Sequence, residues 1–217
     1  MSKKTIWEYL KAKGFSDVAT AAVMGNMEAE SNCISQRLQG DFTSGCRKSV
    51  EYTEKVDSGE ITRDQFIYNG PGGGGYGLCQ WTFWSRKAGL YDLAQEQGVS
   101  IGDEFIQVEW LTRELWQAEF QPVLKVLQTS QNIRECSDVL VKQFLRPADQ
   151  SEAVLAQRAK YAREIYSEFA GEQAEDPDGM PDTVEVSEAE YKAMNRALLV
   201  VMYLKDILNM LEEFDYD

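Results

Sequence analysis

The feature of this sequence that most restricts its fold is the helical spacing of its apolar residues. From residue 84 to residue 169, large apolar side chains recur three or four positions apart, which places them on one face of a helix. The alternating valine, isoleucine and threonine patterns of strands are nearly absent. The segments with helical spacing are 84–97, 101–116, 122–127, 133–145 and 151–169. The sequence therefore predicts an all-α fold.

The first third of the chain predicts two helices followed by a polar insertion. A short helix is expected over 5–13, ending at Gly14. Ser16 is a plausible N-cap for a second helix over 17–31. The region 32–83 is polar and rich in glycine, so we expect a loop-rich insertion with only a helical turn or two around SVEYTEKVD.

The end of the chain differs in charge and composition. Residues 1–172 carry 19 Lys and Arg against 24 Asp and Glu, whereas 173–217 carry 3 against 12. The acidic segment 173–187 contains two prolines and is predicted to be a linker. The final part, 188–217, is predicted to hold an amphipathic helix whose apolar seam covers 188–213. This helix needs a partner surface, which its own domain, a second copy or another protein could provide.

Composition excludes several classes of chemistry. The chain has 217 residues and no histidine, so it cannot use Ser-His-Asp or Cys-His catalysis or bind a metal through histidine. Its four cysteines form no CxxC pair, and neither a metal nor a cofactor is expected. Cys33 and Cys46 flank a short loop and could be bridged or remain free thiols. A net charge of −14 without a basic stripe argues against nucleic-acid binding.

Neither a membrane span nor a Sec signal peptide is expected. The longest apolar run, 197–204, is too short to cross a bilayer. The first residues, MSKKTIWEYLKAKG, are charged and lack the apolar core of a signal peptide. A protein of this kind that acts outside a cell would need another route of delivery.

Two acids in the stretch GNMEAES follow the uncharged segment 18–27. Glu28 and Glu30 are two positions apart, so on a helix they point in different directions. Both have apolar neighbours one turn earlier, and at least one carboxyl is expected to be partly desolvated, which raises its pKa as a general acid requires. Spacing does not choose between them, and both could instead be ordinary solvated acids near a helix end.

The stretch YGLCQWTFWSRKAGL, residues 76–90, concentrates aromatic and amide side chains after a run of glycines. Aromatic faces beside amides suit the stacking and hydrogen bonding of sugar rings, but the same residues could form a packed corner under a loop. The glycines are not a phosphate loop, because no GKS or GKT follows them.

Taken together, these stretches resemble the phage tail lysozyme family, a branch of the lysozyme-like superfamily. The resemblance covers roughly residues 5–170 and rests on IWEYLKAKGFSDVATAAVMGNMEAES, EYTEKVDSG, GYGLCQWTFWSRKAGL, VSIGDEFIQVEWLTREL and FLRPADQ…QRAKYAREIY. It implies a two-lobed, lysozyme-like domain over 1–172 that is all-α, or α+β at most. Members of this family resemble enzymes that open the glycan strands of peptidoglycan.

The resemblance also implies site residues. By match to the family's Glu-Ser pair, Glu30 is the general acid and Ser31 accompanies it at the substrate site. The GYGLxQW motif is matched by residues 75–81, which implies substrate contacts from Tyr76, Gln80 and Trp81, although Trp81 could equally belong to the core. Asp41 ranks first as a second catalytic carboxylate, although it could also be a solvated loop acid.

The function implied is cleavage of peptidoglycan between N-acetylmuramic acid and N-acetylglucosamine by a phage or mobile-element lysin. Lytic transglycosylation and non-catalytic binding to the cell wall are the alternatives. The implied place of action is the bacterial cell wall, with the protein carried on a virion or released by another route. A phage tail or secretion component, or a second copy, could then bind the helix over 188–213.

Overall fold

The computed structural model describes residues 3–68 and 74–170, and within them the secondary structure is helical. No strand forms in this part of the chain; two isolated bridges join Tyr76 to Leu38 and to Trp81. The prediction of an all-α fold is therefore confirmed for the described residues. The longer helices are α1 (Lys3–Ala12), α2 (Asp17–Ser31), α3 (Arg47–Asp57), α5 (Trp84–Gln97), α6 (Glu104–Leu115) and α9 (Glu152–Phe169). The shorter ones are η1 (Ser44–Cys46), α4 (Arg63–Tyr68), η3 (Ala118–Phe120), α7 (Gln121–Thr129), α8 (Ile133–Val139) and the π-helix η4 (Leu140–Leu145).

Helix α2 lies at the centre of the fold and is buried all round from Val18 to Met27. Its start is the predicted one, because the Ser16 side chain accepts a hydrogen bond from the N–H of Ala19. Helices α1, α8 and α9 pack against it. The contact with α9 is close: a Cβ at Gly25 would lie 2.5 Å from the backbone nitrogen of Ala162. Glycine here lets the two backbones approach, which fixes the end of α2 relative to α9.

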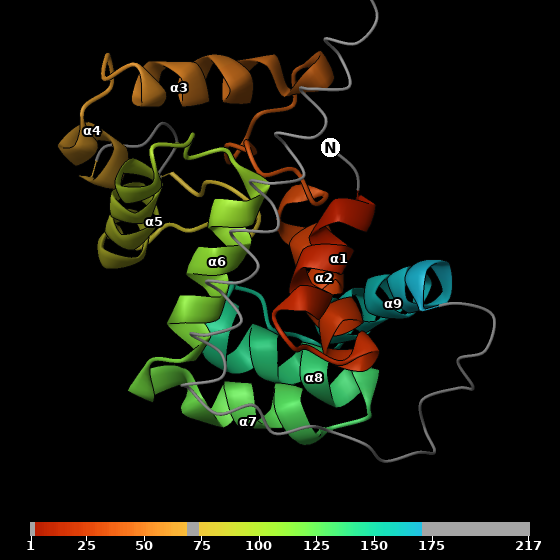
Figure 1. Cartoon of the computed structure of the whole chain (residues 1–217). Helices are drawn as coiled ribbons and strands as arrows, with labels where there is room; N and C mark the ends of the chain where they lie inside the picture. Colours follow the sequence, from red (N-terminus) through yellow and green to blue (C-terminus); the bar gives the residue numbers. More distant parts are fainter. Residues whose placement is uncertain (1–2, 69–73, 171–217) are drawn as a thin grey trace, which may run out of the picture.

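The insertion is more helical than the sequence predicted. It contains α3, which is longer than the turn or two expected, and also α4, which was not expected. Apolar residues four apart, Tyr52 and Val56, bury one face of α3, and Phe66 and Ile67 are buried from α4. Figure 1 shows α4 and α5 on one side of α6, with α1, α2 and α9 on its other side. The region is rich in loops as expected, but its helices exceed the turn or two predicted, because a helix with few apolar residues is stable when those residues pack into a core.

The predicted linker over 173–187 and the predicted C-terminal helix over 188–217 lie outside the described residues. Within 3–68 and 74–170, none of the helices is long and apolar enough to cross a membrane.

Candidate functional site

Glu30 lies in the last turn of α2, beside a cleft. The C-cap residue Asn32 has a left-handed backbone, its N–H donates to the carbonyl of Glu28 at 2.9 Å, and the N–H of Cys33 donates to that of Met27 at 3.3 Å. The Glu30 side chain is 17% exposed, whereas Glu28 turns the other way and pairs with Lys3 of α1 at 3.0 Å. The two acids therefore face different surroundings, as their spacing predicted.

An arginine from α9 holds Glu30. Arg158 Nη2 lies 2.7 Å from Glu30 Oε1, and its Nη1 donates to Asn26 Oδ1 at 3.2 Å. Asn26 is one turn before Glu30, so a single guanidinium spans the last two turns of α2. Among the described residues no hydrogen bond reaches the second oxygen of Glu30, Oε2. Arg158 is itself buried, and its Nε–H has no partner there.

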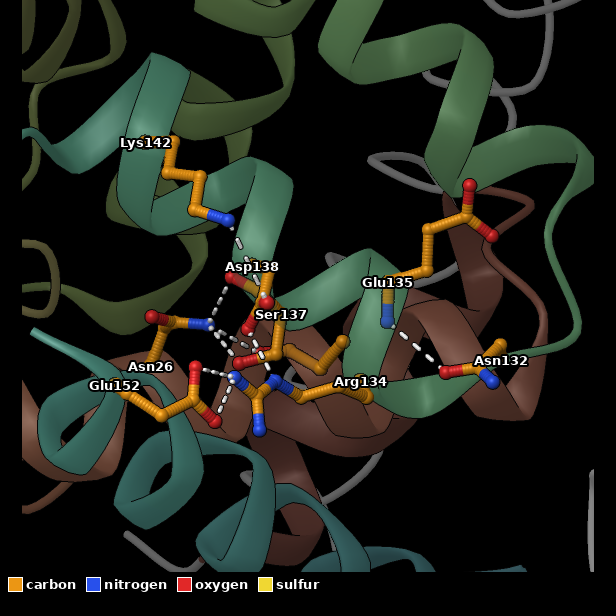
Figure 2. Close-up of polar contacts among 9 residues, drawn as sticks. Asn26, Asn132, Arg134, Glu135, Ser137, Asp138, Lys142 and Glu152 are labelled. Atoms are coloured by element: carbon orange, nitrogen blue, oxygen red, sulfur yellow. Dashed lines mark hydrogen bonds and ion pairs between the residues drawn. The ribbon is translucent and has the colours of Figure 1, made fainter. Parts of the chain in front are cut away.

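Asn26 also connects α2 to α8. Its Nδ2 donates to Ser137 Oγ at 3.1 Å (Figure 2). On the same helix, Arg134 pairs with Asp138 at 2.7 Å and with Glu152, the first residue of α9, at 2.8 Å. These contacts hold the start of α9 against α8, and therefore fix the helix that carries Arg158.

The turn GYGLCQW forms the next part of the site. Its ends pair through the N–H groups and carbonyls of Tyr76 and Trp81, while Gly77 and Gln80 adopt positive φ. Ser31 donates to the carbonyl of Leu78 at 3.1 Å and so attaches this turn to the end of α2. Ser31 is 2% exposed. Its hydroxyl therefore connects the turn to the end of α2, which carries Glu30, and is not presented to a ligand.

A cleft of about 960 Å³ lies between these elements, within the size range of ligand sites. Glu30 and Gln80 both line it, which places the proposed acid and the amide of the motif on one cavity. Gln80 is held there because its Nε2 donates to the carbonyls of Arg37 and Gly77, each at 3.0 Å. Further lining comes from Phe83 and Arg86 of α5 and from Trp110 and Glu114 of α6.

A second arginine–glutamate pair lines the same cleft. Arg86 donates to both oxygens of Glu114, at 2.6 and 2.9 Å, and the indole N–H of Trp81 donates to Oε2 at 2.8 Å. Burial raises the pKa of the Glu114 carboxyl, although these donors oppose the shift. With three donors on a carboxyl that is 1% exposed, Glu114 is satisfied by the protein itself.

Two of the predicted substrate-binding residues belong to the core. Tyr76 is 0% exposed, and its hydroxyl shares a 2.6 Å hydrogen bond with Thr53. Trp81 is 1% exposed, and its indole N–H donates to Glu114. Neither lines the cleft, although the resemblance implied that both would contact substrate. Their part in substrate binding stays a prediction. From these buried positions, the two side chains would affect a ligand only through the shape of the turn.

Asp41 is 2% exposed and does not line the cleft. Its carboxylate accepts from the N–H and hydroxyl of Ser49, at 2.8 and 2.6 Å, and from the N–H and hydroxyl of Thr43. These bonds hold the pKa of Asp41 below its usual range. Ser49 is in the first turn of α3, so Asp41 caps this helix from outside it. Its catalytic role stays a prediction, and the Asp41 side chain is not among those that line the cleft.

The cysteines are free thiols, including Cys33 and Cys46, for which a bridge had been one of two alternatives. Arg37 donates to the sulfur of Cys46 at 2.7 Å, and Cys33 is buried. Burial raises the pKa of the Cys79 thiol well above its usual value, so it is unsuited to act as a nucleophile near neutral pH. Within 3–68 and 74–170, no group of three or more Cys, Asp or Glu side chains could hold a metal ion.

The sequence analysis missed Arg158, Glu114 and a third carboxylate at the cleft, Glu119. Glu119 belongs to η3 and pairs with Arg146 at 3.1 Å, with both side chains more than half exposed. Arg146 follows the π-helix η4, an element that is frequent at functional sites. Helical spacing could have marked Arg158, since it interrupts the apolar face of the segment 151–169.

Comparison with known proteins supports the family inferred from these motifs. A search of curated proteins found no match. The family model described as phage tail lysozyme matches residues 2–169, most of the chain, including every described element that lines the cleft. This match gives the chain a lysozyme-like role directed at peptidoglycan, in a phage tail context. The protein belongs to the phage tail lysozyme family.

Proposed function

We propose that this protein cleaves the glycan strands of peptidoglycan between N-acetylmuramic acid and N-acetylglucosamine, with Glu30 as the proton donor. The observation that carries the proposal is the position of Glu30 at the cleft, with one carboxyl oxygen bound by Arg158 and the other without a partner in the described residues. Glycoside cleavage requires a carboxylic acid that protonates the leaving oxygen. Glu30 and Glu114 each pair with an arginine at the cleft, but Glu30 has an oxygen left for substrate and Glu114 does not.

The Arg158 contact orients the Glu30 carboxyl, which aids proton transfer. A glycan that fills the cleft removes water from it, so that the proton passes to the leaving oxygen without competition from solvent.

Hydrolysis also requires activation of water or of an intermediate by a second carboxylate. Glu119 is a better candidate by position than Asp41, because it lines the cleft and its exposed ion pair with Arg146 is weak, about 0–1 kcal/mol. Its pairing with an exposed arginine leaves it free to exchange partners when the substrate enters. Asp41, which accepts four hydrogen bonds, is proposed to brace the insertion.

Lytic transglycosylation is the second candidate, and the saturation of Glu114 favours it, since hydrolysis would then depend on the exposed Glu119 as its second carboxylate. In that reaction the substrate's own hydroxyl closes an anhydro ring, and no second carboxylate needs to activate water. Purified protein and purified peptidoglycan distinguish the two: new reducing ends indicate hydrolysis, and anhydro-muramyl ends indicate transglycosylation.

The same assay with Glu119→Gln and Asp41→Asn identifies the second group. We expect Glu119→Gln to reduce hydrolysis, while Asp41→Asn lowers thermal stability and leaves the rate per folded molecule near that of the wild type. Absence of glycan cleavage by the wild type rejects the enzyme assignment and favours a wall-binding tail component. Loss of cleavage in folded Asp41→Asn would restore Asp41 as the catalytic partner.

A further inference from the structure

Three exposed aromatic side chains lie together at one edge of the cleft. Tyr68 is 63% exposed, Phe83 61% and Trp84 49%. The ring of Trp84 stacks with that of Tyr68 at a centroid distance of 6.2 Å and lies 6.0 Å from that of Phe83. A single exposed aromatic residue is ordinary, whereas several in mutual contact form an apolar patch that needs an explanation. We refer to Tyr68, Phe83 and Trp84 as the aromatic platform.

The platform is continuous with the cleft and has a stable base. Phe83 contacts Trp84 on one side and also lines the cleft. Phe83 is the N-cap residue of α5, Trp84 begins this helix, and Tyr68 ends α4, which packs against α5. Because the three rings come from two packed helices and the residue that caps one of them, they keep their relative positions, as a stacking surface requires. A ligand that leaves the cleft past Phe83 therefore meets Trp84 and then Tyr68.

The chemistry of the platform suits a neutral, hydroxyl-rich polymer. The carbon–hydrogen faces of a sugar ring stack on aromatic rings, while its hydroxyls need polar partners beside them. Thr82 and Ser85, both exposed and both lining the cleft, supply hydroxyls next to Phe83. The platform itself contains no charged side chain, so it does not select for an ionic ligand. A membrane surface is disfavoured as the occupant, since the chain carries a net charge of −14.

We propose that the aromatic platform is an outer subsite that binds the glycan strand where it leaves the cleft, an inference that rests on the proposed glycan-cleaving function. A strand of peptidoglycan is a polymer, and its sugars extend beyond the bond that is cut. Stacking outside the cleft adds affinity for long strands without touching the reacting atoms. The protein therefore prefers intact wall polymer to short oligosaccharides.

The test uses the full chain with Glu30→Gln, so that wall polymer is bound but not consumed. Binding to purified peptidoglycan is measured by co-sedimentation for this protein and for its derivatives with Trp84→Ala or Tyr68→Ala. We expect Trp84→Ala to weaken binding roughly tenfold, the size of one lost aromatic contact, and Tyr68→Ala to weaken it less. The matched control is Phe42→Ala, because Phe42 is 90% exposed and does not line the cleft.

A second measurement separates an outer subsite from a structural defect. In the background with Glu30 intact, KM is compared for polymeric glycan and for a short oligosaccharide. We expect Trp84→Ala to raise KM for the polymer more than for the oligosaccharide, with the unfolding midpoint preserved. Equal losses on both substrates, or binding that matches the Phe42→Ala control, would overturn the proposal. So would a dimer that Trp84→Ala dissociates without weakening wall binding, since a second copy would then be the occupant.

These outcomes are distinct from a failure of the proposed function. Co-sedimentation measures binding to the platform even if the wild type cleaves nothing. Conversely, loss of cleavage in Glu30→Gln with unchanged binding in Trp84→Ala supports the function and rejects the outer subsite.

Discussion

Two of the three arginine–glutamate pairs that the described residues form at the cleft, Glu30–Arg158 and Glu114–Arg86, differ in the hydrogen-bonding capacity that each carboxyl keeps. Glu30 and Arg158 join α2 to α9 through one contact of 2.7 Å, and the Glu30 side chain keeps 17% of its exposure. Glu114 and Arg86 join α6 to α5 through a two-pronged contact, with Trp81 as a third donor. Burial and ion pairing therefore do not distinguish the two carboxyls. Their remaining hydrogen-bonding capacity does, and it supports the proposal of Glu30 as the proton donor.

The largest effect on activity is expected when the Glu30 carboxyl is replaced. Glu30→Gln keeps the shape and an acceptor oxygen for Arg158 but cannot donate the proton, so cleavage should fall at least about 100-fold. Release of soluble glycan from purified peptidoglycan measures this rate, and circular dichroism checks the fold. Glu28→Gln is the matched control, because Glu28 pairs with Lys3 and not with Arg158. If the control loses activity and Glu30→Gln does not, the assignment of the acid is reversed.

The second test breaks the saturated pair. Glu114→Leu leaves the Arg86 guanidinium, 18% exposed, without its carboxylate, and should destabilise the protein by about 3–5 kcal/mol. The double variant Arg86→Met/Glu114→Leu should be less destabilised than Glu114→Leu, since no buried charge remains unpaired. Urea denaturation at pH 7 measures both. Arg86→Met alone is measured in the same way, and a double variant that loses as much stability as the sum of Glu114→Leu and Arg86→Met would show that these residues act independently.

Lys87 is a third buried charge at which to extend the comparison, and it has no carboxylate partner among the described residues. Its Nζ donates to the carbonyl of Gly74 at 3.2 Å and lies over the ring of Phe66, and burial lowers its pKa from 10.5 to about 8. The unfolded chain therefore holds this proton more tightly, and the lysine weakens the fold at pH 7 by about 3 kcal/mol. As pH rises from 8 to 10.5 this penalty disappears.

Lys87→Met should consequently be more stable than the wild type at pH 7, with the difference shrinking towards pH 10.5. Denaturant titrations of both proteins at several pH values measure this difference in stability. Cysteines and tyrosines are common to both proteins, so their titration cancels in the difference. Lys160→Met is the control, since Lys160 is exposed on α9 and, within 3–68 and 74–170, pairs only with its helix neighbour Glu164. A difference that does not change with pH would contradict the assigned shift.

The smallest effect is expected at Arg158. Arg158→Met removes the group that orients Glu30, while the contact of Gly25 with Ala162 keeps α2 and α9 together. We expect kcat to fall about tenfold and KM to change little, because orientation matters in the transition state and not in binding. Arg163→Met, an exposed change on the same helix, is the control. An unchanged kcat would mean that Arg158 contributes to packing alone.

Much of the fold could be read from the sequence because helices are local. The predicted helix over 84–97 coincides with α5, and Ser16 caps α2 as expected. The segment 133–145 was predicted as one helix and is α8 followed by a π-helix, since apolar spacing does not register a change of hydrogen-bond partner. The insertion was underestimated because α3 is capped by Asp41, a residue outside the helix, and no local pattern shows such a cap.

The sequence by itself determined the helical class, the separate directions of Glu28 and Glu30, and the pairing of a Glu-Ser end with an aromatic turn. It could not divide the aromatic residues of 76–84, because a turn with two positive φ angles sends Tyr76 and Trp81 inward and leaves Phe83 and Trp84 outside. Only the tertiary structure brings Arg158 to Glu30 and Arg86 to Glu114. The physical reason is that the state of a carboxyl depends on burial and on donors that arrive from distant helices.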